Sequence, residues 1–364
     1  MTRPVSTPRD IAAIIAEAAS ILGRGGVVAF PTETVYGLGA AAVNVAAVRR
    51  VFAVKGRPAD HPLIVHIAGV DALDDWARAI PDAARELARI CWPGPLTLVL
   101  PRRSHVSDTV TGGQDSVALR IPAHPLALQL ITAAGALVAP SANRFGRISP
   151  TTARHVADEL GDSIDLVVDG GPCTVGVEST IISLLGVQPV LLRPGAILPA
   201  QIESVLGESL ARCDGGVRVP GALPAHYAPV TPLELVEHKD LDARLTALAT
   251  PGGVRLAVLR AGEPPGALRP GVQWVAMPDD AQAYARVLYA TLRRVDAAGH
   301  ERLLVAMPPD RPAWLAVRDR LGRAARAFAV PNRPPQSGGG QETSPNTAAG
   351  SDGKRAMVLP GRRT

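Results

Sequence analysis

The chain has 364 residues, 47% of them apolar and 20% charged, a composition typical of a globular protein long enough for two domains. The formal net charge is only +5, and much of it lies in residues 331–364, so a strong polyanion-binding surface is not expected elsewhere. Aromatic residues make up 3% of the chain, which argues against a base-stacking platform for single-stranded nucleic acid.

The N-terminal part of the chain predicts an alternation of helices and buried strands. Apolar residues at helical spacing predict a helix from about residue 8 to residue 22, and a buried strand follows at 27–30. After the polar turn 31–34, a short helix, the cationic turn 55–58 and an apolar run at 63–67 complete the unit. Hydroxyl groups at one strand end, beside two cations on a Gly-Pro turn, suit a small anionic ligand.

Helices and strands continue to alternate as far as residue 210. The predicted helices are 72–91, 125–134, 152–160 and 199–210, the predicted strands are 96–100, 116–121, 136–139, 164–168, 179–185 and 190–192, and 101–115 is predicted as a polar loop. Because strands and helices are interleaved, we expect the α/β class. Because strands outnumber helices, we expect a twisted, mixed open sheet with some antiparallel pairing.

Composition divides the chain into four parts. Residues 1–207 form the expected α/β domain, and residues 208–232, rich in Gly and Pro, form an expected linker or lid. Residues 233–330 are predicted to form a smaller Rossmann-like domain without a Gly-x-Gly-x-x-Gly turn, and 331–364 a disordered tail. In the smaller domain, strands are predicted at 255–259, 273–276 and 303–306, and helices at 240–248, 280–297 and 311–328.

Several polar residues in this pattern could carry chemistry, and each has a plainer alternative. Thr32 could contact a small zwitterion, or its hydroxyl could satisfy turn amides. Lys55 and Arg57 could bind phosphate, as a point charge and as a fork, or they could be solvated surface charges. His66 could be a hydrogen-bonded core residue. Arg120, at a strand end, could be an exposed residue or could bind a carboxylate with two hydrogen bonds.

Other chemistries have no motif in this sequence. The chain has no Gly-x-Ser-x-Gly elbow, no His-Glu-x-x-His and no Cys-x-x-Cys, so no covalent enzyme intermediate is indicated. Its three cysteines, Cys91, Cys173 and Cys213, lack metal-ligand spacing. No signal peptide is visible, and no apolar run approaches the ~20 residues of a membrane span, so a cytoplasmic protein without membrane contact is expected.

Eight sequence motifs, taken in order, resemble those of a known family. They are PTETVYGLG, KGRPADHPLIVH, WPGPLTLVL, SVALRIPAHPLA, APSANRFGRISPT, GVESTI, LLRPG and HYAP. Their order and spacing are similar to those of the YrdC family, the threonylcarbamoyl-AMP synthases, in its long two-domain form up to about residue 328. The resemblance implies a twisted open sheet around a deep, positively lined cleft.

The resemblance also implies a reaction and a set of residues. L-Threonine, bicarbonate or CO2, and ATP would give threonylcarbamoyl-AMP, pyrophosphate and water, with Mg²⁺ as a cofactor whose ligands are not indicated. Lys55 and Arg57 would stabilise charge, and no side chain would act as a covalent nucleophile. The implied threonine-binding residues are Thr32, His66, Arg120 and Ser179, and the implied ATP-binding residues are Lys55, Arg57, His61, Thr111, Ser141, Asn143, Ser149, Arg193 and Tyr227.

The implied product would pass to a downstream transferase machinery that modifies adenosine 37 of tRNAs, so contact with tRNA itself would be weak or indirect. One alternative is a double-stranded RNA- or tRNA-binding module without catalysis, which would bind phosphates in the cleft with a steep dependence on salt. A second alternative is a different carbamoyl-adenylate enzyme. That class carries an acylphosphatase-like region and zinc-finger cysteines, and neither is visible here.

Overall fold

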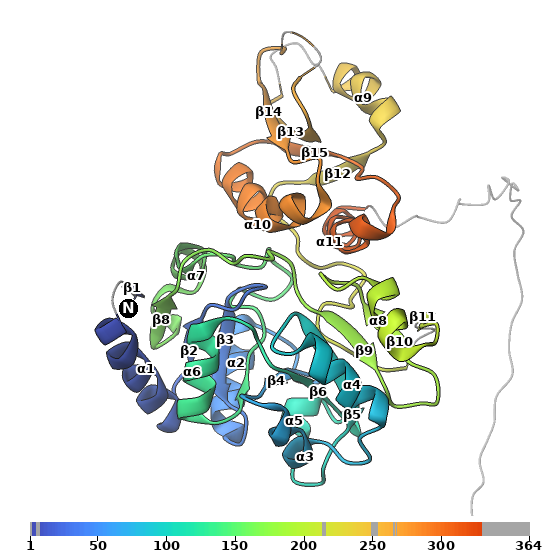
Figure 1. Ribbon diagram of the computed structural model, residues 1–364. Helices are drawn as coiled ribbons and strands as arrows, with labels where there is room; N and C mark the ends of the chain where they lie inside the picture. Colours follow the sequence, from blue (N-terminus) through green and yellow to red (C-terminus); the bar gives the residue numbers. More distant parts are fainter. Residues whose placement is uncertain are drawn as a thin grey trace, which may run out of the picture. The chain divides into compact units, whose positions relative to one another are not determined.

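The larger part of the fold is a mixed, twisted sheet (Figure 1). The computed structural model describes residues 2–4, 8–212, 216–248, 254–264, 266 and 268–329. Over these residues the sheet has the strands β1 (Thr2–Pro4), β2 (Val28–Phe30), β3 (Gly37–Ala41), β4 (Ile64–His66), β5 (Leu96–Pro101), β6 (Ser116–Arg120), β7 (Leu137–Val138), β8 (Leu166–Asp169), β9 (Thr180–Ser183), β10 (Val190–Arg193) and β11 (Ala211–Arg212). Their order is β1-β8-β2-β3-β7-β4-β6-β5-β9-β10-β11, with both parallel and antiparallel pairs, so the predicted mixed α/β sheet is confirmed.

Helices cover both faces of this sheet. They are α1 (Pro8–Gly23), α2 (Val45–Lys55), α3 (Leu73–Trp76), α4 (Asp82–Cys91), α5 (Asp108–Thr111), α6 (Pro125–Ala134), α7 (Ala153–Leu160) and α8 (Pro199–Leu206). In β2, Val28 and Phe30 pack against α1 and α6, which lie side by side, whereas Ala29 points to the opposite face and to α2 and α7. This alternation follows from the period of two in a strand, and it explains why the strand is apolar throughout.

The register of the strands brings two of the predicted site residues together. Strands β4 and β6 are parallel neighbours, and His66 and Arg120 are opposite each other at their carboxyl ends. Strand β9 is parallel to β5 and antiparallel to β10, so residues just before β9 and at the end of β10 share one edge. In open α/β sheets, ligands bind beyond strand ends of this kind.

The predicted helix at 72–91 is wrong as a single element. The structure has α3 and α4 instead, with Ala77 pairing to Arg102 in a short antiparallel bridge. Pro81 precedes α4, and a proline lacks an N–H and disfavours helical geometry in the residue before it. The predicted loop at 101–115 contains the short helix α5, whose first turn is capped by the hydroxyl of Ser107.

Strand β3, which contains Gly37 and Gly39, was not predicted from the sequence. Both glycines allow β3 to approach β2 closely. A Cβ atom on Gly39 would lie 2.7 Å from the ring of Phe30 and 3.1 Å from the carbonyl oxygen of Val28. The glycines therefore permit a tight antiparallel pair, and the strand signal of larger side chains is absent.

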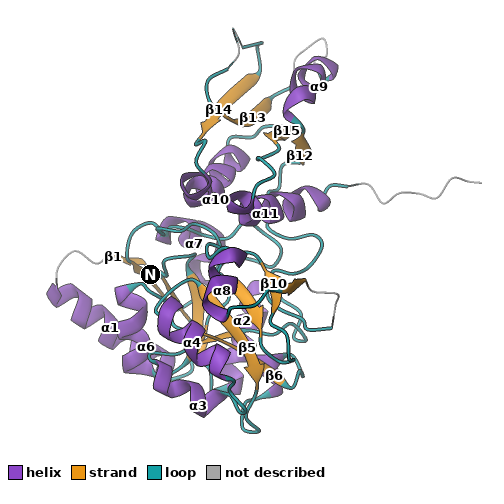
Figure 2. Ribbon diagram, turned by 45° about the vertical axis from the view of Figure 1, so that its right-hand side comes forward, coloured by secondary structure: helices purple, strands orange, loops and turns teal. Residues whose placement is uncertain are grey.

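A second, fully parallel sheet follows in the chain (Figure 2). Its strands are β12 (Leu233–Val236), β13 (Leu256–Ala261), β14 (Val272–Met277) and β15 (Arg302–Ala306), in the order β12-β15-β13-β14, and its helices are α9 (Leu241–Ala247), α10 (Ala281–Ala297) and α11 (Leu315–Arg326). Val258 and Leu304 pack with α9, while their neighbours Leu259 and Val305 pack with α10 and α11. Helices on both faces of a parallel sheet give the predicted Rossmann-like layout, although β12 was not predicted.

The apolar cluster under α10 and α11 continues into loops of the first sheet. It includes Val35, Ile148, Val177 and Tyr227 together with residues of both helices. Both sheets belong to the same compact unit, Met1–Ala329. The predicted tail at 331–364 and Cys213 lie outside the described residues. No helix in the described part of the chain is long and apolar enough to cross a membrane.

Candidate active site

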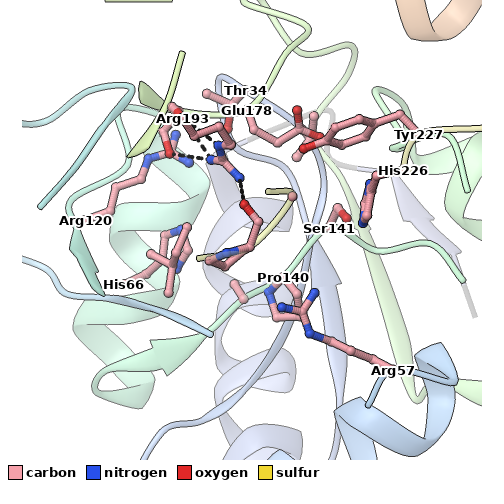
Figure 3. A pocket seen from close by; sticks show the side chains of 16 residues that line it. Thr34, Arg57, His66, Arg120, Pro140, Ser141, Glu178, Arg193, His226 and Tyr227 are labelled. Carbon is pink, nitrogen blue, oxygen red and sulfur yellow. Dashed lines mark hydrogen bonds between the residues drawn. The ribbon is translucent and has the colours of Figure 1, made fainter. Parts of the chain in front are cut away.

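A cavity of about 510 Å³, part of it open to solvent, lies at the ends of several strands of the first sheet (Figure 3). Its walls come from the turn after β2, the ends of β4, β6 and β10, the loop after β7, and two short stretches at 220–221 and 226–227. Only about 50 Å³ of this space admits a water-sized molecule, less than the roughly 300–1,000 Å³ of typical small-molecule sites, so the walls would have to move apart to admit a large ligand. The cavity nevertheless lies at strand ends, where the predicted residues are expected.

Arg120 and His66 lie side by side at one end of the cavity, and both are buried. Arg120 donates through Nε to the carbonyl oxygen of Gly94 at 3.2 Å and through Nη2 to Oε1 of Glu33 at 2.7 Å. Neither bond uses Nη1. Because the guanidinium is planar and fixed on two sides, its remaining N–H groups are well placed to bind a carboxylate in the cavity.

His66 is a neutral imidazole beside this arginine. Burial, together with the positive charge of Arg120, lowers the pKa of His66 to about 3. Its Nδ1 has no hydrogen-bond partner among the described residues, although the atom is buried. A buried polar atom without a partner is costly unless a ligand or water completes its hydrogen bonding. His66 is therefore available to a polar group of a bound molecule.

Ser179 and Arg193 form a second hydrogen-bonded group on the wall, and Arg193 is labelled in Figure 3. Arg193 donates to the carbonyl oxygen of Ser179 from Nε at 3.1 Å and from Nη2 at 2.9 Å, and Nη2 also reaches the Ser179 hydroxyl at 3.1 Å. Its Nη1 donates to the carbonyl oxygen of Pro220 at 2.8 Å. The hydroxyl of Thr97 lies 2.7 Å from that of Ser179. Arg193 therefore joins the start of β9 to the segment that follows β11.

Glu178, the neighbour of Ser179, is the most strongly bound acid of the site. Its Oε1 accepts from the Ser149 hydroxyl at 2.6 Å, and its Oε2 accepts from the Tyr289 hydroxyl at 3.0 Å and from Nε of Arg320 at 2.8 Å. Burial acts to raise the pKa of Glu178, but the charges of Arg320 and Arg193 and the Ser149 bond outweigh it and hold the pKa at about 2. Glu178 is thus ionised at all ordinary pH values.

Arg57 lies beside a group of aromatic rings at the other end of the cavity. Arg57 donates through Nη2 to the carbonyl oxygen of Pro62 at 2.8 Å, its guanidinium lies 5.8 Å from the ring centre of Phe145, and its Nε has no partner among the described residues. The His226 ring packs edge-on against Phe145 and against Tyr227. Burial lowers the pKa of Arg57 to about 10 and that of His226 to about 3. The guanidinium therefore keeps its charge, while the imidazole is neutral.

Lys55 supports the loop that forms one wall of the cavity. It is the last residue of α2, which ends at Gly56 in the left-handed region. Its Nζ donates to the carbonyl oxygens of Ser141 and Asn143, at 2.6 and 2.5 Å. Burial, and then the charge of Arg57, lowers the pKa of Lys55 to about 7. The predicted cationic turn therefore lies at the end of α2. Lys55 supports the wall of the cavity, and Arg57 lines the cavity itself.

Many of the predicted residues meet in this one cavity. Those that line it are Arg57, His66, Arg120, Ser141, Ser179, Arg193 and Tyr227. Lys55, Asn143 and Ser149 do not line it but bond to residues that do or to the adjoining loop. Asn143 donates to the carbonyl oxygens of Arg144 and Arg147, and its Oδ1 has no partner among the described residues.

Three further predicted residues are also absent from the cavity lining. The hydroxyl of Thr32 is used within its own turn, where it donates to the carbonyl oxygen of Val35 at 2.6 Å, and Thr34 lines the cavity instead. Thr111 lines a separate small cavity, and its hydroxyl has no partner among the described residues. His61 packs edge-on against Phe145 at 5.4 Å between ring centres. Their predicted contacts with substrates stay predictions.

Lys55 lines a second, wider groove instead. The groove contains several arginines from the loop at 144–148, α7 and α10. Three of them are paired, Arg147 with Asp296, Arg154 with Asp158, and Arg293 with Glu159. Much of the positive charge there is therefore neutralised by neighbouring carboxylates.

Sequence analysis missed three of the residues that organise the site. Glu33 lies in a quoted motif, but nothing in the sequence shows that it pairs with Arg120. Tyr289 and Arg320 come from α10 and α11, more than a hundred residues after Glu178. One signal was present, because Arg320 lies among the apolar positions of α11, and a charge on such a face usually has a buried partner.

Gly195 is expected to be essential for the packing of this site. A Cβ atom there would lie 2.5 Å from the carbonyl carbon of Ser179 and 2.7 Å from the carbonyl oxygen of Glu178, both backbone atoms that cannot move aside. Gly195→Ala should therefore lower the free energy of unfolding by about 1–3 kcal/mol. Urea denaturation would measure this, with Gly186→Ala as the control because a Cβ there meets no atom within 4 Å. Equal stability of the two variants would contradict the expectation.

Comparisons with known proteins show the family of this chain. Residues 20–195 match a family model described as Telomere recombination (Sua5_yciO_yrdC), and residues 197–326 match one described as Threonylcarbamoyl-AMP synthase, C-terminal domain. The chain is 41% identical over 320 residues to the threonylcarbamoyl-AMP synthase of Pyrococcus abyssi, covering 85% of this chain and 93% of that protein. It is 42% identical over 320 residues to the threonylcarbamoyl-AMP synthase of Bacillus subtilis, covering 85% and 92%.

The fold is likewise similar to solved structures. The crystal structure of P. abyssi Sua5 complexed with L-threonine superposes with a TM-score of 0.79 at 38% identity, covering 90% of this chain and 98% of that chain. The similarity extends over both sheets of this protein, and the predicted family is confirmed by sequence and by fold. The chain belongs to the threonylcarbamoyl-AMP synthase family.

Proposed function

We propose that this protein makes threonylcarbamoyl-AMP and pyrophosphate from L-threonine, bicarbonate or CO2, and ATP. The observation that carries the proposal is one cavity, in a chain of this family, lined by Arg120 and His66 at one end, by Arg57 at the other, and by Arg193 beside Ser179. Arg120 and His66 suit an amino-acid carboxylate and its neighbouring polar group. Arg57 and Arg193 suit phosphate oxygens. The solved relative with bound L-threonine supports the same substrate here.

At the threonine end, Arg120 would bind the carboxylate through N–H groups that Glu33 and Gly94 leave free. The neutral ring of His66 and the hydroxyl of Ser179 would contact the amino group or the carbamate that forms on it. Thr34 lines the cavity and is a further candidate in place of Thr32, whose hydroxyl bonds within the turn. These assignments rest on position and on unpartnered polar atoms.

At the ATP end, the reaction needs little more than placement and charge. The threonine nitrogen adds to CO2 to give a carbamate, a carbamate oxygen attacks the α-phosphorus, and pyrophosphate leaves. Arg57 and Arg193 would neutralise the phosphates, and Lys55 would hold the loop of Ser141 and Asn143 against the nucleotide. Orienting the two reactants can recover roughly 7–11 kcal/mol of barrier, and fixed cations stabilise the departing charge.

Ser149, Tyr227, His61 and Thr111 complete the proposed ATP side. Ser149 acts through its bond to Glu178, and Tyr227 lines the cavity with a hydroxyl that has no partner among the described residues. We also propose the domain boundaries expected from the sequence. They are a catalytic domain at 1–207, a linker or lid at 208–232 and a smaller domain at 233–330. The two lining stretches at 220–221 and 226–227 support a lid role, since a covered cavity would protect a labile anhydride from water.

Mg²⁺ is not supported as a resident metal of this site. The described residues contain no group of three His, Cys, Asp or Glu side chains able to hold a metal ion. The two acids near the cavity are already engaged, Glu33 by Arg120 and Glu178 by Arg320. Any Mg²⁺ in the reaction would arrive on the ATP phosphates, and the residue roles above do not depend on it.

The alternative of an RNA-binding module without catalysis has no support in the geometry. The cavity cations Arg57, Arg120 and Arg193 are 8%, 4% and 3% exposed, too little for contact with the phosphates of a duplex. The product would instead be a small diffusible mixed anhydride. We propose that it passes to a tRNA threonylcarbamoyl transferase machinery acting on adenosine 37, with weak or indirect contact between this protein and tRNA.

Pyrophosphate release from ATP tests the proposed reaction. The purified protein should release pyrophosphate only when both L-threonine and bicarbonate are present, because the nucleophile is their carbamate. Release without threonine would identify a nucleotide hydrolase instead. ATP binding without release, combined with RNA binding that weakens steeply with salt, would favour the binding module.

A further inference from the structure

Arg320 is a completely buried charge on the helix α11. Val317, Leu321 and Ala324 recur at helical spacing and pack into the core beneath α10 and α11, and Arg320 lies among them at 1% exposure. An arginine is rarely buried to this extent unless several partners compensate for the lost water. The identity of those partners therefore indicates why an arginine is present.

The partners of Arg320 come mostly from the active-site part of the chain. Its Nε donates to Oε2 of Glu178 at 2.8 Å, and its Nη1 donates to the carbonyl oxygen of Pro194 and to Asp319, each at 2.8 Å. Its guanidinium also lies 5.3 Å from the ring centre of Tyr227. Glu178 and Tyr227 both line the cavity. Helix α11 thus contacts the cavity wall through the Arg320 side chain, and also through the Arg323 carbonyl oxygen, which accepts from the N–H of His226.

Glu178 connects Arg320 to residues on both sides of the site. Its other oxygen holds the Ser149 hydroxyl, on the proposed nucleotide side. The next residue, Ser179, lies on the proposed threonine side, and its backbone and hydroxyl are held by Arg193. A rotation of the Glu178 side chain would therefore disturb Ser149 directly and the backbone at Ser179 through the peptide bond.

We propose that Arg320 is a positioning residue for the synthase reaction and that, by holding Glu178, it makes the second sheet and its helices part of the working active site. This inference rests on the proposed function. Arg320 touches no reacting atom. It acts by keeping Glu178 ionised and fixed, and the chain then needs α11 in place for turnover as well as for stability.

A changed pH dependence would separate positioning from simple structural support. The titratable groups that face Glu178 are Lys55 of α2, Arg193 of β10, Tyr289 of α10, Arg320 of α11, and His226 and Tyr227. Without the charge of Arg320, only Arg193 and the Ser149 hydrogen bond would still lower the pKa of Glu178, and burial would raise it. Protonation of Glu178 would then become possible in the range where activity is measured.

The experiment compares Arg320→Gln, Glu178→Gln and the matched control Arg318→Gln. Arg318 is on the same helix, but its contacts are with Pro308 and Asp310, away from the cavity. Pyrophosphate release that depends on threonine and bicarbonate is measured from pH 6 to pH 9, with thermal unfolding of each variant. We expect R320Q to lower kcat/KM about tenfold at pH 8 and further toward pH 6. R318Q should follow the wild-type profile.

The double variant decides whether Arg320 acts through Glu178. The inference is supported if the loss of kcat/KM in E178Q/R320Q is smaller than the product of the two single losses, and if kcat/KM of E178Q does not depend on pH. It is overturned if folded R320Q keeps the wild-type rate and profile, or if the two losses multiply. If R320Q does not fold, E178Q must still show a loss near tenfold, and a wild-type rate in E178Q overturns the inference. Wild-type protein without threonine-dependent release would instead refute the proposed function.

Discussion

Replacing Arg120 by alanine is expected to reduce kcat/KM for threonine by about tenfold to a hundredfold. A charge-assisted hydrogen bond contributes roughly 1.5–3 kcal/mol, and the upper end of that range corresponds to about a hundredfold. The loss should appear mainly as a raised KM for threonine with a smaller change in KM for ATP, because Arg120 lies beside His66 and away from Arg57. Steady-state pyrophosphate release at varied threonine measures it.

The same substitution removes the partner of a buried carboxylate. Glu33 is 7% exposed and accepts from Arg120 and from the backbone N–H of Ala123. Breaking one side of a buried ion pair typically costs about 3–5 kcal/mol of stability. Glu33→Gln separates the two effects, because it keeps Arg120 in the cavity while removing the paired charge. Arg78→Ala breaks an exposed pair with Asp115 and serves as the control. An unchanged KM for threonine in folded R120A would contradict the assignment.

The residues that could be predicted from sequence are those whose place follows from local structure. Arg120 and His66 lie at the ends of apolar runs, and parallel strands bring such ends to one edge. Arg57 follows Gly56, whose left-handed conformation ends α2 and turns the chain toward the cavity. In these cases a short segment determines both the element and the direction of the side chain.

Other features depend on packing between distant segments, which no local pattern records. Glu178 is joined to Arg320 across 142 positions of sequence, and Glu33 to Arg120 across 87. The sequence also does not show which of two neighbouring residues in one turn lines the cavity. Thr32 and Thr34 have similar chemistry, and only the turn geometry determines that Thr32 bonds to Val35 while Thr34 lines the cavity. The motif therefore located the site but did not decide which hydroxyl reaches it.

Replacing Lys55 by methionine is expected to raise KM for ATP by about tenfold to a hundredfold, with little change in KM for threonine. Methionine keeps the apolar stem but removes the donor to the carbonyl oxygens of Ser141 and Asn143 and the positive charge behind the proposed phosphate site. With ATP bound, when Lys55 is expected to be charged, losing such charge-assisted hydrogen bonds costs roughly 1.5–3 kcal/mol. Lys239→Met, on an exposed short helix, is the control.

The pKa of Lys55 gives this prediction a second, independent measurement. Burial lowers the pKa to about 7, so at pH 8 the free protein holds Lys55 mostly neutral, and the negative charge of ATP should raise the pKa and draw in a proton. Calorimetry at pH 8, in two buffers with different ionisation enthalpies, should therefore show proton uptake on ATP binding in the wild type and less in K55M. Equal uptake in both proteins would place ATP away from Lys55.

The same pKa determines the sign of a change in stability. Between pH 7 and the ordinary lysine pKa of 10.5, the unfolded chain holds a proton on Lys55 that the folded chain lacks. The free energy of unfolding contributed by this group therefore rises with pH across that interval, and it is absent in K55M. Urea denaturation at pH 7 and pH 9 should show a larger increase for the wild type than for the variant. The absence of that difference would mean that Lys55 is not buried as a neutral amine, and that its hydrogen bonds alone position the loop.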